Sequence, residues 1–325
     1  MRSIFFNLLL TVTLFVADAS IVSAQKTDAP YLKFQSLNDL PTVLEWPATV
    51  TDGRYVYVVN PYTSARITTA VIRFDPKTAK WAVASTAASK KIQAAAAWSP
   101  TDSHIYVFGG TVNGGWKIFA GVESINTNTG EIKDLGIINP MPTVYGCAAA
   151  WDKLIYVFGG TQNADHTIAS MYSFDPQNKQ FTRLADMPES VQTAGAIVNG
   201  VLYTFGGFDQ FLNTQSKNIN AYDIKTNTWK TVATLPRGIS SNAVAVCGDL
   251  IFVVGDYNEE TFLGYYNTSN NTFVKLNSNM TGHRAGGAAV INNILYVFGG
   301  KTNYKTTLGG IKTVQAADIS GLLDK

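Results

Sequence analysis

The chain has 325 residues, 46% of them hydrophobic and 15% charged, which is enough to build a large buried core. Its formal net charge is +2 and no basic run occurs, which excludes nucleic-acid binding through a basic patch. The charges are scattered, so lysines such as Lys90 and Lys91 are predicted to lie on solvated faces.

The N-terminal segment is predicted to be an export signal. A basic start at Arg2 is followed by an apolar run over residues 4–17, and Val22-Ser23-Ala24 supplies the small residues of a cleavage site. Asp18 ends the run before it reaches the roughly 20 apolar residues that span a bilayer. We therefore expect a signal peptide over residues 1–24 and a secreted product, periplasmic if the source is a Gram-negative bacterium. No membrane span is expected in the mature chain.

A short apolar strand recurs six times downstream of this signal. The second residue of each copy is aromatic, and these residues are Tyr57, Tyr106, Tyr156, Tyr203, Phe252 and Tyr296. They are spaced by 49, 50, 47, 49 and 44 residues, and a regular period of this length indicates a repeat architecture. Four copies end in Gly-Gly, whereas the first ends in Asn60-Pro61 and the fifth in Gly255-Asp256.

The fourth repeat shows the unit most clearly. Asn199-Gly200 is a strong signal for a two-residue hairpin turn between strands. The strands expected in this repeat are residues 194–198, 201–205, 218–222 and 229–232, with a loop over residues 208–217. Four antiparallel strands that follow one another in each repeat are the blade of a β-propeller.

Each landmark of the repeat has a physical role in such a fold. The first strand is rich in small residues, which suits the crowded axis where the blades converge. Aromatic residues of the second and fourth strands, such as Tyr203 and Trp229, are suited to fill the space between neighbouring sheets. Asp or Asn after the third strand, as in Tyr222-Asp223, is expected to cap the following turn by bonding its own backbone.

The two ends of the chain are predicted to close the ring. The last repeat has a strand near residues 313–319 and stops without a fourth strand, while the segment Phe34–Leu37 matches the fourth strand of another repeat. This N-terminal strand should complete the last blade and remove the exposed edges. The predicted fold is an all-β, six-bladed β-propeller of four-stranded antiparallel blades, formed by residues 25–325 as one monomeric domain.

The repeat resembles the Kelch-repeat family, including secreted relatives related to the central domain of galactose oxidase. The matching elements are the double glycine after an apolar strand, an aromatic–Asp pair, and an aromatic residue six or seven positions later, as in Phe74-Asp75 with Trp81. The resemblance extends from about Phe34 to the end of the chain. It implies binding through the loops of one face, usually to a protein and in secreted relatives sometimes to a glycan.

Two sets of loops are expected to share that face, those after the double glycines and those that link one blade to the next. Binding residues concentrate in loops on a rigid scaffold, and aromatic residues interleaved with polar ones suit recognition of glycans or extended peptides. The candidate ligand-binding residues are Tyr62, Trp116, Tyr145, His166, Phe208, Asp209, Phe211, Arg237, Tyr257, His283, Arg284 and Tyr304. In the alternative interpretation, the aromatic members pack between blades or plug the loops.

The sequence leaves open whether the chain is an enzyme and favours a binding module. The fold resembles that of copper radical oxidases, which need two histidine ligands and a tyrosine cross-linked to a cysteine, but the only histidines are His104, His166 and His283. It also resembles that of exported sialic-acid mutarotases, whose ring opening needs an acid–base pair near the axis. Glu259, Glu260 or His283 would serve in that role. No catalytic residue, cofactor or metal site is predicted.

Two further motifs bear on the exported state. Cys147 and Cys247 lie in repeats that are not neighbours and at different offsets, so two buried free thiols are expected in place of a disulfide. Three acceptor sequons, at Asn267, Asn270 and Asn279, mark an exposed rim of the fifth repeat if the source cell glycosylates its exported proteins.

Overall fold

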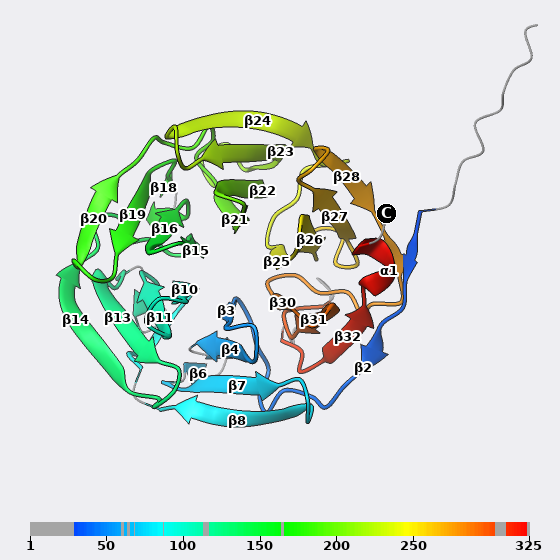
Figure 1. Ribbon diagram of the computed structural model, residues 1–325, viewed down its shortest axis with the longest axis horizontal. Coiled ribbons are helices and arrows are strands. Elements are labelled where there is room, and N and C mark those ends of the chain that lie inside the picture. Colours follow the sequence, from blue (N-terminus) through cyan, green and yellow to red (C-terminus); the bar gives the residue numbers. More distant parts are fainter. Residues whose placement is uncertain are drawn as a thin grey trace, which may run out of the picture.

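The computed structural model describes residues 29–59, 69–86, 88–112, 117–163, 166–302 and 310–323, and the backbone alone of residues 62–63 and 66–67. It is a ring of six four-stranded antiparallel sheets, which confirms the predicted six-bladed β-propeller. The first strand of each blade is innermost and the fourth is outermost (Figure 1). The predicted signal peptide lies outside the described residues. No helix in the described part of the chain is long and apolar enough to cross a bilayer.

Each of the first three blades is built from one repeat. Blade 1 contains β3 (Ala48–Thr51), β4 (Val56–Val59), β7 (Val71–Asp75) and β8 (Lys80–Ser85). Blade 2 contains β10 (Ala95–Ser99), β11 (His104–Phe108), β13 (Gly121–Asn126) and β14 (Ile132–Ile138). Blade 3 contains β15 (Cys147–Trp151), β16 (Leu154–Phe158), β19 (Met171–Asp175) and β20 (Gln180–Arg183).

The other three blades follow the same order, except that the last one takes its outer strand from the N-terminus. Blade 4 contains β21 (Gln192–Val198), β22 (Val201–Asp209), β23 (Thr214–Asp223) and β24 (Thr228–Thr234). Blade 5 contains β25 (Ala243–Cys247), β26 (Leu250–Val254), β27 (Leu263–Asn267) and β28 (Thr272–Lys275). Blade 6 contains β30 (Gly287–Ile291), β31 (Ile294–Phe298), β32 (Val314–Asp318) and β2 (Gln35–Ser36), and the short helix α1 (Ser320–Leu323) follows β32.

The hairpin between β21 and β22 has the turn that the sequence predicts. Asn199 and Gly200 have φ angles of 50° and 77°, as a two-residue turn with two left-handed positions requires. The predicted loop over residues 208–217 is wrong, because β22 and β23 continue through most of it. The register shifts between Phe205 and Gly207, so the double glycine forms a bulge inside a long hairpin and does not end the strand.

The double glycine brings the end of the second strand against the link to the next blade. Gly109 has a φ of +65°, and a Cβ on it would lie 2.1 Å from the carbonyl oxygen of Thr143. The amide of Gly110 donates a hydrogen bond to that same oxygen at 2.8 Å. A residue with a side chain at Gly109 would therefore meet both backbone strain and a steric clash.

Aromatic residues fill the space between neighbouring blades, as predicted. The ring centroid of Phe74 in blade 1 lies 5.6 Å from that of Phe298 in blade 6, and 5.0 Å from that of Trp81 in its own blade. In blade 4 the rings of Tyr222 and Trp229 are 5.1 Å apart. Burying one such side chain contributes about 1.5–3 kcal/mol, so packing between blades is a main source of stability.

The predicted caps after the third strands are present. Oδ1 of Asp223 accepts a hydrogen bond from the amide of Thr226 at 2.9 Å, and Oδ1 of Asp175 accepts one from the amide of Gln177 at 2.9 Å. Hydrogen bonds from the turn, for Asp175 chiefly from the amide of Asn178, favour the ionised carboxylates and lower both pKa values. Each cap satisfies backbone donors that the tight turn leaves without a strand partner.

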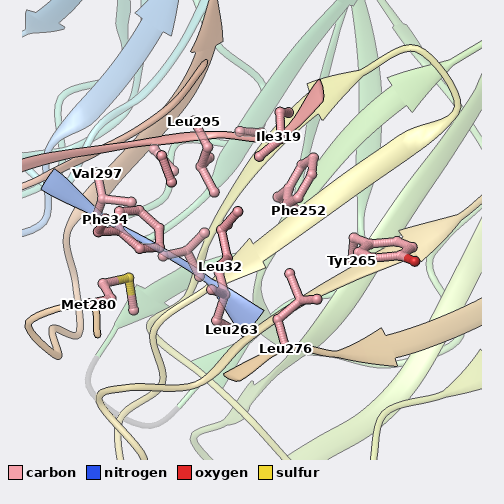
Figure 2. Packing of buried hydrophobic residues seen from close by; sticks show 14 of the residues in the cluster. Leu32, Phe34, Phe252, Leu263, Tyr265, Leu276, Met280, Leu295, Val297 and Ile319 are labelled. Carbon is pink, nitrogen blue, oxygen red and sulfur yellow. The ribbon is translucent and has the colours of Figure 1, made fainter. Parts of the chain in front are cut away.

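The N-terminal segment closes the ring as predicted and also contacts the neighbouring blade. Gln35 in β2 pairs with Ala316 in β32. The preceding strand β1 (Tyr31–Leu32), which the sequence did not predict, pairs in parallel with β29 (Asn277–Ser278) after blade 5. Figure 2 shows Leu32 and Phe34 packed into the cluster of apolar side chains that blades 5 and 6 share. We call residues 31–36 the N-terminal strap.

Two smaller predictions need correction. Lys91 is fully buried and forms an ion pair with the buried Glu123, so it does not lie on a solvated face. Cys147 and Cys247 are free thiols, as predicted, but both are only partly buried. Desolvation raises the pKa of both thiols, that of Cys147 to about 11.

Candidate functional site

The two predicted loop sets meet on one face of the ring, which we call the loop face. Four short pairings join a segment after the second strand to a link between blades. They are β12 (Thr111–Val112) with β9 (Lys91–Ile92), and the bridges Val144–Thr161, Arg284–Lys301 and Leu44–Ile311. Blades 1 and 3 carry in addition the small hairpins β5 (Tyr62–Thr63) with β6 (Arg66–Ile67), and β17 (Thr161–Asn163) with β18 (His166–Thr167).

A cavity of about 230 Å³ lies at the axis, at the end of the channel that opens on the loop face. Each blade lines it with four consecutive residues, which in five blades comprise the end of an inter-blade link and the start of the first strand, and in blade 4 lie within β21. These segments are residues 46–49, 93–96, 145–148, 192–195, 241–244 and 285–288. The small residues at the start of the first strands leave this space open, and the large side chains of the lining come from the links that precede these strands or from Gln192.

The mouth of the cavity is formed by one residue from each blade at the same place in the repeat. In five blades this residue has a left-handed φ between 45° and 58°, although none of the five is glycine. The five residues are Trp46, Gln93, Tyr145, Ser241 and Ala285. Blade 4 places Gln192 there, inside a β-bulge. Left-handed conformations of residues other than glycine are uncommon and cluster at functional sites.

Hydrogen bonds between blades hold several of these residues in place. The amide of Trp46 donates to the carbonyl of Ala285 at 2.8 Å, and the amide of Tyr145 donates to that of Gln93 at 3.0 Å. Nε2 of Gln93 also donates to the hydroxyl of Tyr145 at 2.6 Å. The rings of Trp46 and Tyr145 are 5.9 Å apart and inclined by 66°. Together they form an aromatic corner at one side of the mouth.

A second feature of the loop face is a charged network between blades 4 and 5. The Asp256 side chain is fully buried, and its Oδ1 accepts hydrogen bonds from the amide of Ser240 at 2.9 Å and from Nε2 of Gln215 at 3.1 Å. Arg237 lies 3.3 Å from Asp256 and also 3.3 Å from Glu259. Asp256 stands where four other repeats have their second glycine, and its carboxylate organises the loop around it.

A wide cleft lies beside this network, between the loops of blades 5 and 6. Its lining includes Tyr257, Glu259, Glu260 and Thr281. The guanidinium carbon of Arg284 lies 4.1 Å from the ring centroid of Tyr257, and Nη1 of Arg284 donates to the carbonyl oxygen of Tyr257 at 3.3 Å. Because the cation and the ring stabilise each other, Arg284 supports Tyr257 in the lining of the cleft.

Four of the predicted residues lie at the axial cavity or around the cleft between blades 5 and 6. Tyr145 lies at the cavity mouth, and Arg237, Tyr257 and Arg284 lie together around the cleft. Trp46 is absent from the prediction. Its position relative to the following strand matches that of Tyr145, and this periodic position is the signal that would have found it.

The remaining predicted residues lie elsewhere. Phe208 and Asp209 are in β22, where Oδ1 of Asp209 caps the turn by accepting hydrogen bonds from the amides of Phe211 and Leu212, both at 2.9 Å. Phe211 is 80% exposed at the tip of this hairpin, and His166 is exposed at the start of β18. Only the backbone of Tyr62 is described. Trp116 and Tyr304 lie outside the described residues.

His283 lies inside the link between blades 5 and 6 and does not contribute to an exposed binding surface. The residue is 1% exposed, and neither ring nitrogen has a hydrogen-bond partner in the described part of the chain. Its imidazole packs so closely against Gly286 that a Cβ there would lie 2.0 Å from Nδ1. Burial lowers the pKa of His283 from 6.5 to about 4. The histidine that the mutarotase interpretation would use is therefore a buried neutral group.

Acid should destabilise the folded protein through His283. Above about pH 6.5 the imidazole is neutral in both the folded and the unfolded chain. Between about pH 6.5 and pH 4 only the unfolded chain binds the proton, so the free energy of unfolding falls as the pH falls. The full loss is about 3 kcal/mol for a shift of this size. Urea unfolding from about pH 7 to about pH 4 measures it.

The matched comparison for this prediction uses two variants. His283→Gln should show a weaker dependence of stability on pH over that range, because it lacks the buried titrating group. His166→Gln removes an exposed histidine and should keep the wild-type dependence. An identical pH dependence in wild type and His283→Gln would exclude His283 as the source.

The three sequons have different surroundings. Asn279 forms two hydrogen bonds with Phe34 of the N-terminal strap. Its Oδ1 accepts a hydrogen bond from the amide of Phe34 at 2.7 Å, and its Nδ2 donates one to the carbonyl of Phe34 at 3.0 Å. A glycan on Nδ2 of Asn279 would replace one of the two N–H hydrogens of this atom, next to its hydrogen bond with Phe34. Oδ1 of Asn267 accepts a hydrogen bond from the amide of Ser269 at 2.9 Å, and Asn270 is exposed in the turn before β28.

Comparison with known proteins identifies one family. The profile of the KLHDC2/KLHL20/DRC7 Kelch-repeats domain matches residues 46–256, more than half of the chain. Kelch-like protein 38 of Rattus norvegicus is 33% identical over 151 residues, which are 46% of this chain and 25% of that protein. Kelch-like protein 23 of Homo sapiens is 28% identical over 201 residues, which are 61% of this chain and 34% of that protein.

The solved structure of YjhT has the same fold. Its TM-score is 0.73 at 18% sequence identity, and the match covers 86% of this chain and 95% of that one. The chain thus spans nearly the whole of one solved structure but only a quarter to a third of the two Kelch-like proteins. The likeness at this identity extends to the architecture alone.

Proposed function

The chain belongs to the Kelch-repeat family, and on that premise we propose that it is a secreted binding module that recognises a protein or glycan partner through its loop face. The family repeat supplies a rigid ring, and the loops that differ between repeats gather on one side of it. The apolar N-terminal segment over residues 1–24 supports export. N-terminal sequencing of the secreted product, with Gln25 expected as its first residue, tests that part.

One observation carries this proposal. Six equivalent backbone positions surround the mouth of the axial cavity, and they hold side chains of different kinds, among them Trp46, Tyr145 and Gln192. Five of these positions share an uncommon left-handed backbone, so the repeat holds the backbone constant while the side chains vary. This arrangement suits recognition, because rigid aromatic and amide groups bind a partner with little loss of conformational entropy.

The same surroundings favour a binder over a sugar-active enzyme. An enzyme site brings together titratable groups with shifted pKa values in one pocket. Among the described residues that line the axial cavity, the titratable side chains are those of Tyr145 and Cys147. Desolvation raises the pKa of the Cys147 thiol to about 11, which keeps it protonated and weakly nucleophilic at neutral pH.

Screening the purified protein against a glycan array and a displayed peptide library tests the proposal. We expect the wild type to select members of at least one library. The double variant Trp46→Ala/Tyr145→Ala should lose at least about tenfold in affinity, because aromatic anchors dominate such sites. Thermal unfolding of each variant confirms that it is folded.

Trp151→Ala is the matched control. Trp151 is also partly exposed, but it lies at the turn between β15 and β16, on the opposite face of the ring. This variant should bind as the wild type does. The proposed function is wrong if neither library yields a ligand. It is also wrong if Trp151→Ala abolishes binding of the selected ligand while the double variant still binds it.

A further inference from the structure

We propose that the axial cavity binds a single uncharged sugar ring, so that the preferred ligand is a glycan with a neutral terminal or branch residue. This inference rests on the proposed binding function and goes further by naming the ligand class and its position. Four properties of the cavity carry it, namely its aromatic corner, its polar groups, its lack of charge among the described lining residues, and its size.

The aromatic corner provides an apolar surface for the C–H face of a sugar ring. Trp46 and Tyr145 come from blades 1 and 3, and their rings are inclined by 66°. Lys301 has its Nζ 4.7 Å from the Trp46 ring centroid and forms an ion pair with the buried Glu45 at 2.8 Å. These contacts restrict the indole, so little conformational entropy is lost when a ligand packs on it.

Amide groups from three other blades stand around the same mouth. Nε2 of Gln192 donates to Oγ1 of Thr161 at 2.7 Å and to Oε1 of Gln210 at 3.2 Å, which fixes the side chain beside the cavity. Gln93 is fixed by its bond to the hydroxyl of Tyr145. Amide groups both donate and accept hydrogen bonds, which matches the donor and acceptor character of sugar hydroxyl groups.

Asn242 adds a third amide side chain to the cavity lining, from blade 5. Its Nδ2 is buried in the cavity lining and has no hydrogen-bond partner within the described residues. A buried donor without a partner costs about 1–3 kcal/mol, so a rotation of the Asn242 side chain that turns Nδ2 towards a sugar hydroxyl in the cavity would remove this cost. The hydroxyl of Thr49, in the lining contributed by blade 1, is likewise buried without a partner among the described residues.

The charge of the cavity determines which sugars fit. The described lining residues include no Asp, Glu, Lys, Arg or His. Moving a carboxylate or an ammonium group into such a site would remove its hydration without supplying an opposite charge, which is strongly unfavourable. Acidic sugars and charged peptide side chains are therefore disfavoured, whereas a neutral hexose or N-acetylhexosamine loses little hydration free energy when it enters the cavity.

The volume of the cavity limits how much of the ligand enters. About 230 Å³ is less than the roughly 300–1,000 Å³ typical of sites that enclose drug-sized molecules. One sugar ring matches this space, and the rest of a glycan would extend over the loop face. The expected affinity for a single sugar is therefore weak, with a dissociation constant in about the millimolar range.

Saturation-transfer NMR detects binding of this strength. The neutral probes are the methyl glycosides of glucose, galactose and mannose, together with N-acetylglucosamine. The acidic probes are glucuronic acid and N-acetylneuraminic acid. We expect at least one neutral probe to bind the wild type and both acidic probes to bind at least about tenfold more weakly. A library peptide selected by the wild type is titrated in parallel.

Two variants test the position of the site. Asn242→Ala should weaken binding of the neutral probe about tenfold without lowering the unfolding temperature, since Nδ2 has no partner to lose in the described part of the chain. Tyr145→Ala should also lose at least about tenfold in affinity. Trp151→Ala, on the opposite face, should bind as the wild type does. Retained affinity in both cavity variants would overturn the proposal.

The outcomes separate this inference from the proposed function. If no neutral probe binds, or if acidic probes bind equally well, the neutral-sugar site is wrong. A peptide ligand that still needs Trp46 and Tyr145 would then leave the binding-module proposal standing, with a peptide as the occupant of the site. If neither sugars nor library peptides bind, both proposals are wrong.

Discussion

Replacing Lys91 by methionine should lower the free energy of unfolding by about 3–5 kcal/mol. The Lys91 ammonium is fully buried, and its Nζ forms an ion pair with the carboxylate of Glu123 in β13. Methionine has a similar length but leaves the buried carboxylate without its cation. The remaining hydrogen bonds to Glu123, from the amide and hydroxyl of Ser89, do not compensate a full negative charge.

The surroundings of Lys91 explain why the expected loss is large. Its Nζ also lies 4.0 Å from the ring centroid of Phe119, and its backbone belongs to β9, which pairs with β12. Desolvation is the main influence on its pKa and lowers it from 10.5, although the charge of Glu123 acts in the opposite direction. The pair therefore joins the link after blade 1 to blade 2 at a site that water does not reach.

A double-mutant cycle measured by urea unfolding checks this prediction. Lys91→Met/Glu123→Leu removes both charges and should recover much of the stability that Lys91→Met loses, because no isolated charge remains. Lys90→Met, at the exposed neighbouring lysine, should change stability by less than about 0.5 kcal/mol. A Lys91→Met loss as small as that of Lys90→Met would show that the pair contributes nothing.

Lys91 also illustrates what the sequence does not reveal. Its local sequence, Lys90-Lys91-Ile92, suggests a solvated face, and its partner Glu123 lies 32 positions later. The repeat period predicts the backbone of the link but not the side chain that meets it from another blade. Asp256 is a second example. It replaces the second glycine of the double glycine, and only its three-dimensional contacts explain this replacement.

The fold was predictable because its signals are local and repeated. Hairpin turns such as Asn199-Gly200 and caps such as Asp223 are encoded within a few residues, and six copies fix the blade count. The loop over residues 208–217 was predicted wrongly because its local signal, the double glycine, is ambiguous. The glycines signal a bulge as readily as a strand end, and only the pairing with β23 distinguishes the two.

The candidate site was predictable in part. The loop face and Tyr145 follow from the repeat, and both loop sets do meet there. His283 was placed on that face because of its position in an inter-blade link, yet its side chain points inward and is buried. Periodicity gives the position of a residue in the blade but not the direction of its side chain in an irregular link.

Replacing Phe34 by alanine should be the most destabilising change in the N-terminal strap. Phe34 is 4% exposed and packs in the cluster that blades 5 and 6 share, among residues such as Val297 and Met280 (Figure 2). Truncation of a buried phenylalanine costs about 3–5 kcal/mol, since it removes apolar contacts and leaves a cavity. The loss should also loosen the pairing of β2 with β32, because Phe34 immediately precedes β2.

Tyr31→Ala is the matched control, since Tyr31 is an aromatic residue of the same strap but is 63% exposed. It should cost less than about 0.5 kcal/mol. Urea unfolding measures both losses, and limited proteolysis should cleave Phe34→Ala faster, because an opened strap exposes the edge of β32. Equal stability of the two variants would mean that the strap closes the ring through its backbone pairing alone. A large loss of stability in Phe34→Ala alone would mean that the Phe34 side chain, buried between blades 5 and 6, contributes most to holding the ring closed.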